Sequence, residues 1–417
     1  MKICFIADAR SPIAKNWITH FIARGDDVHI ISTYRCPADT LPGATVHQFP
    51  IAFSQLSRIS HNGTFASRKR RSLLSRGLAS FRTGALARFS PEVLWWIRPL
   101  EVARHVETAR DLIRQIAPDM VHAMRIPFEG FLAAKATPPE IPLLVSVWGN
   151  DFTLVANRNP LLARGTRECL DRADALHVDC QRDLDLAMQT WSFQANKPAT
   201  VLPGAGGVQS SLFYPGSADV SLRRRLNISD DAPVIVNPRG FRPYVCSDIL
   251  FQAIPLVLRA FPETVLICTG MQASPVAERW VRRLGIEKSV RLLPSVQRHE
   301  MADLFRLACA MVSASLHDGT PNTLLEAIAC GCFPVAGDIE SVREWITDGM
   351  NGLLCDPTDA NSIADALVRA VGDAQLRETA RPVNARLIGE RADYDKVMKQ
   401  AERLYLEVAR NSDAIAV

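Results

Sequence analysis

The stretch SASLHDGTPNTLLEAIACG, residues 313–331, predicts the end of a strand, a turn and the start of a helix. Asp318 and Gly319 suit the turn, and Thr320 and Pro321 are residue types preferred at the N-cap and the first helical position. A helix that begins after a parallel strand directs free N–H groups and a partial positive charge toward the edge of the sheet where ligands bind. The stretch therefore favours an anion site, and a phosphate would suit it.

Glu326 lies in the same predicted helix, five residues beyond Pro321. At about 1.5 Å per residue this places it roughly 7.5 Å along the helix axis. A carboxylate at that depth can accept two hydrogen bonds from a sugar diol while phosphates rest on the helix end. An ordinary capped helix with a solvated glutamate fits the same residues, so the stretch alone leaves both interpretations open.

Short apolar runs alternate with helical periods along the chain, which is typical of parallel sheets covered by helices on both faces. The strands predicted in the first half cover residues 3–7, 28–32, 120–123, 143–147, 175–178 and 200–202. Those predicted in the second half cover residues 234–236, 265–269, 290–292, 310–313 and 333–336. We therefore expect an α/β protein with two doubly wound, Rossmann-like domains that face a cleft.

Glycine and proline are densest in residues 203–207, which form the predicted linker. We expect an N-terminal domain at 1–205 and a C-terminal domain at 206–392. A final helix at 393–417 is expected to pack back on the N-terminal domain. Each unit then has a normal size for an open α/β domain.

The composition indicates a folded globular protein, because 47% of the 417 residues are hydrophobic and 22% are charged. This excludes a disordered, collagen-like or coiled-coil chain. The 48 basic residues against 44 acidic ones give a net charge of +4, which is too balanced for a general nucleic-acid binder. We therefore expect no nucleic-acid partner.

The ten cysteines include no CxxC pair, and most lie in apolar runs, which is typical of small buried side chains in a reducing compartment. The pair Cys330 and Cys332 lacks the second ligand cluster of a metal site.

The first apolar run stops at Asp8, too early for a signal segment. We expect a cytoplasmic protein.

Motifs of other enzyme classes are missing from the sequence. No G-x-G-x-x-G follows a predicted strand, and no G-x-x-x-x-G-K-[S/T] phosphate loop or G-x-S-x-G hydrolase elbow occurs. The histidines do not form a metal-binding spacing. We therefore expect neither a metal ion nor a cofactor.

The second half resembles glycosyltransferase family 4, the retaining enzymes of GT-B fold. Residues 318–336, DGTPNTLLEAIACGCFPVA, are similar to the family signature E-G-x-P-N/x-x-L-E-A-M-A-C-G-x-P-V-V. The resemblance extends over residues 118–123, 148–151, 201–208 and 351–357. It therefore covers nearly the whole chain.

The resemblance implies roles for residues of the C-terminal domain. Asp318 takes the place of the carboxylate that faces the donor sugar, and Glu326 that of the ribose ligand. Arg239 matches the arginine that binds the diphosphate. The companion lysine is missing, and Arg242 is the nearest cation. Asp318 and Arg239 would be catalytic, and the residues that would bind the donor are Arg242, Gly319, Thr320, Asn322, Thr323 and Glu326.

The N-terminal half departs further from the family pattern. Residues 148–151, WGND, resemble its H-G-x-D loop with tryptophan in place of histidine, so Trp148 and Asn150 are candidates for acceptor or sugar binding. Asp151 is a catalytic candidate that contacts a substrate hydroxyl, although a loop-capping role is equally compatible. His122 is a further candidate for acceptor or sugar binding, but a packing role at a strand end also fits. The second histidine of that motif is replaced by Met124.

A basic segment lies between residues 58 and 98. It contains nine Lys or Arg residues and one acid, Glu92, a local net charge of +8. Trp95 and Trp96 belong to it, and basic charge with interfacial tryptophan suggests an anionic membrane surface or a lipid-phosphate acceptor. A solvated helical insertion is the alternative.

These patterns predict a retaining glycosyltransferase that moves a hexosyl group from a nucleotide sugar, UDP-, GDP- or ADP-linked, to an acceptor hydroxyl. The acceptor would be a saccharide or lipid-linked, in cell-surface polysaccharide or glycolipid biosynthesis at the inner membrane face. The missing lysine and the histidine replacements motivate an alternative, an inactive GT-B-like protein that binds a polyanion or lipid. A nucleotide-sugar epimerase of the same fold is a third possibility.

Overall fold

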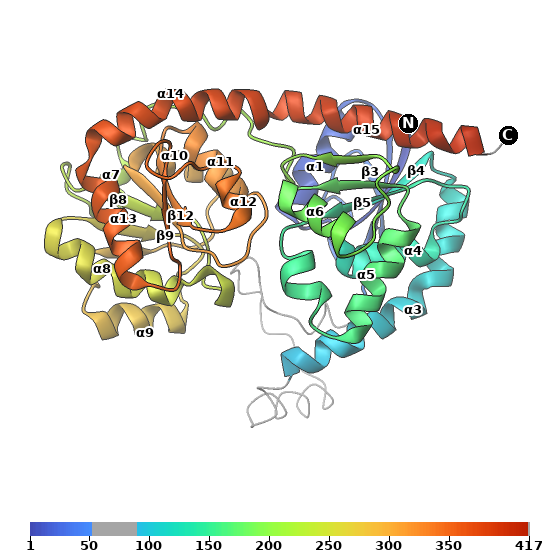
Figure 1. Ribbon diagram of the computed structural model, residues 1–417, viewed down its shortest axis with the longest axis horizontal. Coiled ribbons are helices and arrows are strands. Elements are labelled where there is room, and N and C mark those ends of the chain that lie inside the picture. Colours follow the sequence, from blue (N-terminus) through green and yellow to red (C-terminus); the bar gives the residue numbers. More distant parts are fainter. Residues whose placement is uncertain (52–89, 416–417) are drawn as a thin grey trace. The chain divides into compact units, whose positions relative to one another are not determined.

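The computed structural model describes residues 1–51 and 90–415, which form two compact units (Figure 1). Each unit is built around one parallel sheet. The first unit comprises Met1–Val178, Asp183–Thr200 and Arg403–Val417. The second comprises Asp179–Arg182 and Val201–Glu402.

The sheet of the first unit has seven strands in the order β3-β2-β1-β4-β5-β6-β7. Their bounds are β1 Lys2–Ala7, β2 Asp27–Ser32, β3 Ala44–Gln48, β4 Met120–Ala123, β5 Leu143–Val147, β6 Ala175–Val178 and β7 Ala199–Val201. Strand β1 pairs in parallel with β2 on one side and with β4 on the other. The strand order therefore reverses between β1 and β4, which defines the switch point of this sheet.

Helices of the first unit follow the strands. Their bounds are α1 Pro12–Ala23, α3 Ser90–Ile116, α4 Phe131–Ala136, α5 Pro160–Arg172 and α6 Gln181–Gln189, with two short turns η2 Ile126–Gly130 and η3 Asp151–Ala156. Helix α1 begins where its sequence predicts, because Ser11 accepts a hydrogen bond from the N–H of Ala14 and Pro12 occupies the first turn. Its Trp17 and Phe21 are fully buried.

The sheet of the second unit has six strands in the order β10-β9-β8-β11-β12-β13. Their bounds are β8 Val234–Asn237, β9 Val265–Cys268, β10 Val290–Leu292, β11 Ala310–Ser313, β12 Phe333–Gly337 and β13 Leu353–Cys355. Strand β8 pairs in parallel with β9 and with β11. The switch point of this sheet therefore lies between β8 and β11.

Helices cover both faces of the second sheet. Their bounds are α7 Leu222–Arg225, α8 Ser247–Ala260, α9 Pro275–Leu284, α10 Arg298–Leu307, α11 Asn322–Ala329, α12 Glu340–Arg343, α13 Ala360–Gly372 and α14 Ala374–Arg391, with the short turn η4 Pro243–Val245. Buried side chains of α8 and α13 form one apolar cluster, and those of α10 and α11 belong to another. Two apolar layers against one sheet make it a doubly wound domain.

The predicted architecture of two doubly wound, parallel-sheet units is confirmed, and each predicted strand is present in the structure. Two observed strands were not predicted. Strand β3 lies at the edge of its sheet, where its side chains are only partly covered, so its sequence ATVHQ has no apolar run. Strand β13 has only three residues.

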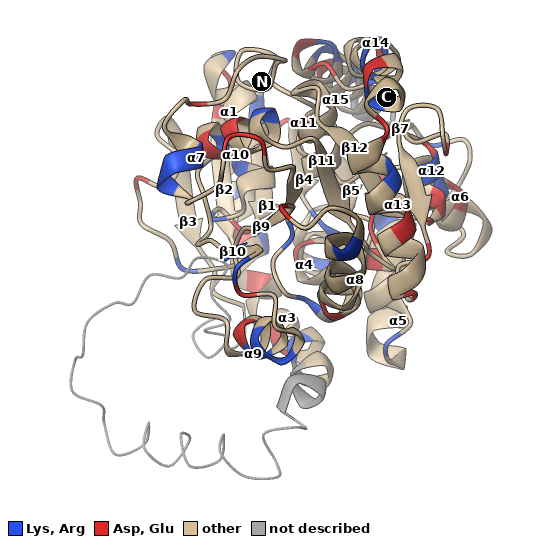
Figure 2. Ribbon diagram, turned by 90° about the vertical axis from the view of Figure 1, so that its left-hand side faces the viewer, with Lys and Arg blue, Asp and Glu red and all other residues tan. Residues whose placement is uncertain are grey.

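The predicted character of the cysteines is also confirmed, since the ten thiols are free and all except the half-buried Cys309 are buried. Among the described residues, no helix is both long and apolar enough to cross a membrane. Charge is mixed on most helices, as on α9, whereas α7 consists of Leu222 and three arginines (Figure 2).

Candidate functional site

An ion pair lies at the switch point of the second sheet. Arg239 follows β8 and Asp318 follows β11, and Nη2 of the arginine is 2.8 Å from Oδ2 of the aspartate. Each side chain is only 14% exposed. Burial raises the pKa of Asp318, and the charge of Arg239 opposes that rise. The two residues predicted to be catalytic in this half are therefore brought together where open sheets bind ligands.

Helix α11 begins one residue later than its sequence predicts. Pro321 is the N-cap, with extended backbone, and Asn322 is the first helical residue. Thr320 is not the cap, because its hydroxyl donates to the carbonyl of Asp179 and accepts from Trp345 Nε1 at 3.0 Å. No side chain caps the helix, so its first N–H groups keep their capacity to bind an anion.

Two further predicted donor ligands border this helix start. The hydroxyl of Thr323 is buried and has no hydrogen-bond partner within the described part of the chain. An unpaired buried hydroxyl is costly, which makes it a natural ligand group. Gly319 has no room for a side chain, because a Cβ there would overlap the carboxylate of Asp179. Glycine is therefore required by the close packing of this turn.

Glu326 lies in the helix as predicted, but it is not a solvated surface residue. Its side chain is 16% exposed, and its Oε1 is 3.5 Å from Nη2 of Arg298. Burial raises the pKa of Glu326 to about 7, against the opposing charge of Arg298. Arg298 also donates to Gln209 at 3.0 Å and lies over the ring of Phe213. Arg298 comes from α10, 28 residues before Glu326, and was not predicted from the sequence.

Arg242 lies near the ion pair and contributes to its electrostatics. Its charge helps to lower the pKa of Asp318. Its Nη1 donates to the hydroxyl of Tyr244 at 3.0 Å. Tyr244 and Cys246 bound the positions where the family lysine is missing, and the backbone of Cys246 is left-handed at φ 48°. Arg242 is therefore a second cation on this loop, beside Arg239, whose charge acts on the aspartate.

In the first unit, Asp151 holds the loops after β4 and β5 in place. Its Oδ1 accepts from Nε and Nη2 of Arg125, each at 2.9 Å. Its Oδ2 accepts from the N–H groups of Ile126 and Trp148, each at 3.2 Å. The side chain has no exposed surface. Because its oxygens are engaged within the unit, this geometry favours the loop-capping alternative for Asp151 over contact with a substrate hydroxyl.

His122 belongs to a buried hydrogen-bond network. Its Nε2 is 2.7 Å from Ser146 Oγ, and its Nδ1 bonds to the hydroxyl of Tyr405. Ser146 is in turn 2.8 Å from Nδ1 of His177. Burial lowers the pKa of His122 well below its usual value. A fully buried ring with both nitrogens bonded favours the packing alternative for His122 over a role in acceptor or sugar binding.

Trp148 and Asn150, in contrast to Asp151 and His122, have polar atoms that are left for a ligand. Trp148 Nε1 and Asn150 Oδ1 are buried and lack a hydrogen-bond partner among the residues that the structure describes. The guanidinium of Arg125 lies 5.7 Å from the centre of the Trp148 ring. Their free polar atoms are therefore compatible with the predicted contact to a ligand.

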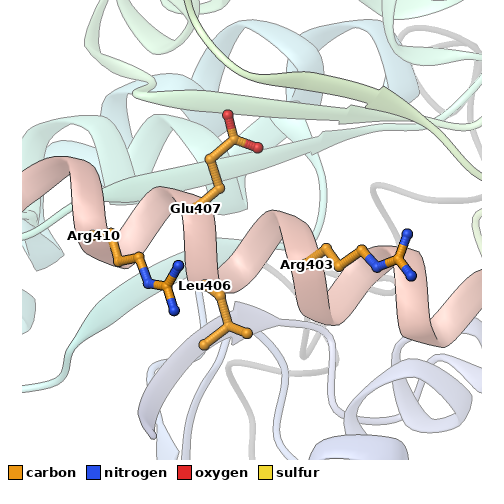
Figure 3. A pocket seen from close by; sticks show the side chains of 4 residues that line it. All are labelled: Arg403, Leu406, Glu407 and Arg410. Carbon is orange, nitrogen blue, oxygen red and sulfur yellow. The ribbon is translucent and has the colours of Figure 1, made fainter.

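Neither the pocket in Figure 3 nor the acidic turn after β6 belongs to this site. The pocket lies on helix α15, Tyr394–Ile415, where the four lining side chains leave one helix in different directions (Figure 3). The acidic turn carries a possible metal-ligand group, Asp179, Cys180 and Asp183. Each of these already interacts with other groups of the chain, so the turn gives no reason to place an ion.

Two parallel-sheet, Rossmann-like units define a protein of GT-B fold. Residues 220–402 match the family model "Glycosyl transferases group 1", and residues 12–204 match "Glycosyl transferase 4-like domain". The chain belongs to the family 4 type of GT-B glycosyltransferases.

Curated relatives align with about half of the chain. A D-inositol 3-phosphate glycosyltransferase of Kribbella flavida is 27% identical over 53% of this chain and 53% of its own length. A GDP-mannose-dependent alpha-(1-6)-phosphatidylinositol monomannoside mannosyltransferase of Mycolicibacterium smegmatis is 34% identical over 40% of this chain and 45% of its own length. The chain thus spans about half the length of these relatives.

Solved structures are similar over the whole chain. Sucrose-phosphate synthase from Thermosynechococcus elongatus has a TM-score of 0.75 at 16% identity, covering 98% of this chain and 99% of its own. Anabaena Alr3699/HepE in complex with UDP has a TM-score of 0.68 at 17% identity, covering 97% and 99%. At these identities the likeness establishes the fold.

Proposed function

We propose that the protein is a retaining glycosyltransferase that moves a hexosyl group from a nucleotide sugar to an acceptor hydroxyl. The observation that carries the proposal is the cluster at the switch point of the second sheet. A buried Arg239–Asp318 pair, an uncapped helix start and the carboxyl of Glu326, whose pKa burial raises to about 7, lie together in one unit. The glycosyltransferase relatives and the UDP-bound neighbour support it.

The second unit would bind the donor. Arg239 and Arg242 would contact the diphosphate, with the N–H groups at Asn322 and the hydroxyl of Thr323. Glu326 would accept hydrogen bonds from the ribose hydroxyls. Asp318 would face the sugar, positioned by its ion pair with Arg239. Gly319 and Thr320 would keep the turn close enough for the phosphates to reach the helix start.

The proposed reaction proceeds on one face of the sugar. The bond between the anomeric carbon and the diphosphate oxygen breaks, and the acceptor oxygen bonds to the same face of that carbon. The acceptor proton passes to the departing phosphate oxygen. The positive charge of Arg239 and the helix start would stabilise the developing phosphate charge, a contribution that is usually large. In this proposal no metal ion or cofactor is required.

The first unit would bind the acceptor, a saccharide or a lipid-linked sugar, with Trp148 and Asn150 as contacts. This suits polysaccharide or glycolipid biosynthesis on the cytoplasmic face of the inner membrane. Residues 58–89 of the basic segment lie outside the described residues, so its membrane contact is proposed from charge alone.

Calorimetry with UDP, GDP and ADP, followed by NMR of the product formed from the matching nucleotide sugar, tests this function. We expect saturable binding of one nucleotide and a product that keeps the anomeric configuration of the donor. An inverted product would refute the retaining mechanism. If none of the nucleotides bound, the inactive polyanion-binding alternative would replace the enzyme.

A further inference from the structure

We propose that the first unit binds its acceptor as an uncharged polyol, with Glu129 and Arg125 as the residues that hold two adjacent hydroxyl groups. The inference rests on the proposed function and names the acceptor class for it. Neither residue was singled out from the sequence. Both lie just after the carboxyl end of β4, a strand that borders the switch point of the first sheet.

The groups around Glu129 come from strand ends at the switch point of the first sheet. Thr33 and Tyr34 follow β2, Asp8 follows β1, and Arg125 follows β4. Electrostatic interactions link the carboxyl of Glu129 to Arg125 and Asp8, and link Tyr34 to Glu129. Ligands of open α/β sheets bind outside the carboxyl ends of the strands at such a point. The position therefore predicts a binding site before any side chain is considered.

Glu129 is unusually buried for a glutamate, since it is only 6% exposed. Thr33 Oγ1 donates to its Oε1 at 2.8 Å, and its own N–H donates to the carboxyl group. Burial raises the pKa of Glu129 to about 7, although the charge of Arg125 opposes the rise. A carboxylate offers about four acceptor sites. Capacity for a hydroxyl ligand therefore remains after these two contacts.

The backbone beside Glu129 is strained. Phe128 has φ 71° and ψ −53°, a conformation that a bulky residue rarely adopts. Gly130, which follows Glu129, donates its N–H to the carbonyl of Arg125 at 2.8 Å. A Cβ on Gly130 would lie 2.7 Å from the sulfur of Cys169. Such strain persists where the surrounding structure enforces it, and it is concentrated at functional sites. Here the strained residue directly precedes the buried Glu129.

The charges around the site are balanced. Arg125 is ion-paired with Asp151 and is 36% exposed, while Arg10 is ion-paired with Asp8 and is 47% exposed. The charged and titratable groups that act on Glu129 or Tyr34 are Asp8, Arg10, Arg98 and Arg125. Among the residues that the structure describes, Arg10 and Arg125 have carboxylate partners and Arg98 is the remaining cation, so these residues provide no strong excess of positive charge for a phosphate. The arrangement favours uncharged hydroxyl groups.

The chemistry of a vicinal diol matches this pair of residues. One hydroxyl can donate to the carboxylate of Glu129 while the neighbouring oxygen accepts from an N–H of Arg125. A guanidinium has five N–H donors, and Asp151 occupies two of them. The ion pair therefore leaves donors for a ligand and fixes the direction in which they point.

The test titrates myo-inositol and methyl α-D-mannopyranoside into the full-length protein, with inorganic phosphate as the charged probe. Binding is followed by NMR of ¹³C-labelled glutamate carboxyl groups, in which the Glu129 signal is the one that E129Q removes. We expect at least one polyol to shift this signal in a saturable way. Its affinity should rise from pH 6 to pH 8 as Glu129 ionises and should be at least tenfold weaker in E129Q at pH 8.

Two further variants separate binding from folding. R125K keeps a charge opposite Asp151 but loses the guanidinium geometry, so it should also weaken polyol binding. E140Q changes an exposed glutamate and should leave polyol binding unchanged. A merely structural role of Glu129 would lower the melting temperature without changing the pH profile of a polyol. Equal polyol affinity in E129Q and wild type, or saturation by phosphate but by neither polyol, would overturn the inference.

Nucleotide binding is measured on the same samples. If nucleotides bind but the polyols do not, the polyol site is refuted and the proposed function stands. If polyols bind through Glu129 but no nucleotide binds, the glycosyltransferase function fails instead. The two ligand sites lie in different units, so the two results are independent.

Discussion

Glu326, the proposed ribose ligand, has a carboxyl group whose charge depends on pH in the neutral range. Its pKa lies near 7, above the ordinary value of 4.5, because burial disfavours its charge. Between those two values the folded chain holds a proton that the unfolded chain has lost. This group therefore makes the folded state less favoured as the pH rises through that window. Nucleotide binding should have the opposite pH dependence, because the carboxylate is the better acceptor.

The first prediction concerns this pH dependence. We expect the affinity for the donor nucleotide sugar to rise between pH 6 and pH 8 in wild type and to be nearly constant in E326Q. Glu326→Ala should weaken binding by about 1.5–3 kcal/mol for each charged hydrogen bond lost. Calorimetry across this pH range measures both variants, with the exposed Glu287→Gln as the control. Wild-type binding in E326A would make Glu326 a structural residue only.

The second prediction concerns Arg239. Arg239→Gln should lower kcat more than it raises KM, because phosphate charge increases in the transition state. The change also leaves buried Asp318 without its partner, so the double variant R239Q/D318N separates the loss of stability from the loss of catalysis. Steady-state kinetics of both variants, beside the exposed Arg259→Gln, measure the effect. Unchanged kinetics in R239Q would shift the proposed role to Arg242.

At this scale the sequence predicted some residues better than others. Asp318 and Glu326 share one continuous stretch, so their spacing could be assessed without the fold. The environment of His122 could not, since its partner Tyr405 is 283 residues away. Arg125, Glu129 and Arg298 were missed because a single charged residue has no sequence pattern of its own.

Among the elements, helix α15 makes a contact that no local pattern predicts. Tyr405 bonds through its hydroxyl to Trp17 Nε1 at 3.0 Å and to His122, and its ring stacks on Phe21. All four side chains are fully buried. One residue of this helix therefore bonds to side chains from both α1 and β4.

The third prediction follows from this contact. Tyr405→Phe keeps the ring but removes the hydroxyl that bonds to Nε1 of Trp17 and Nδ1 of His122, which should cost about 1–3 kcal/mol for each atom left unsatisfied. Urea unfolding followed by tryptophan fluorescence measures the loss. Tyr214→Phe, at a half-exposed tyrosine, is the matched control and should change little. Equal stability of the two variants would show that the hydroxyl of Tyr405 contributes nothing.

The elements also show where propensity alone is insufficient. The sequence placed the start of α11 at Thr320 from cap preferences, yet Trp345 and the carbonyl of Asp179 engage that hydroxyl. The helix consequently begins after Pro321. Tertiary hydrogen bonds thus decided a boundary that local preferences had placed one residue earlier.

For the whole molecule, charge is concentrated in one segment. Residues 58–98 carry +8, so the remaining chain carries −4. If residues 68–71, RKRR, contact anionic lipid, each charge should contribute about 1 kcal/mol near the surface. Changing all four to Gln should abolish co-sedimentation with anionic vesicles at physiological salt while nucleotide binding survives. Failure of the wild-type protein to co-sediment even at low salt would contradict membrane contact.

The division of α15 between the units affects how the protein is synthesised. The first unit includes Arg403–Val417, and Leu404, Tyr405 and Val408 are buried. During translation, residues 1–200 therefore emerge with part of their core uncovered, and the last helix can cover it only after the second unit has been made. A fragment that ends at residue 200 should expose this apolar surface and aggregate, and a peptide of residues 394–415 added in trans should restore its solubility.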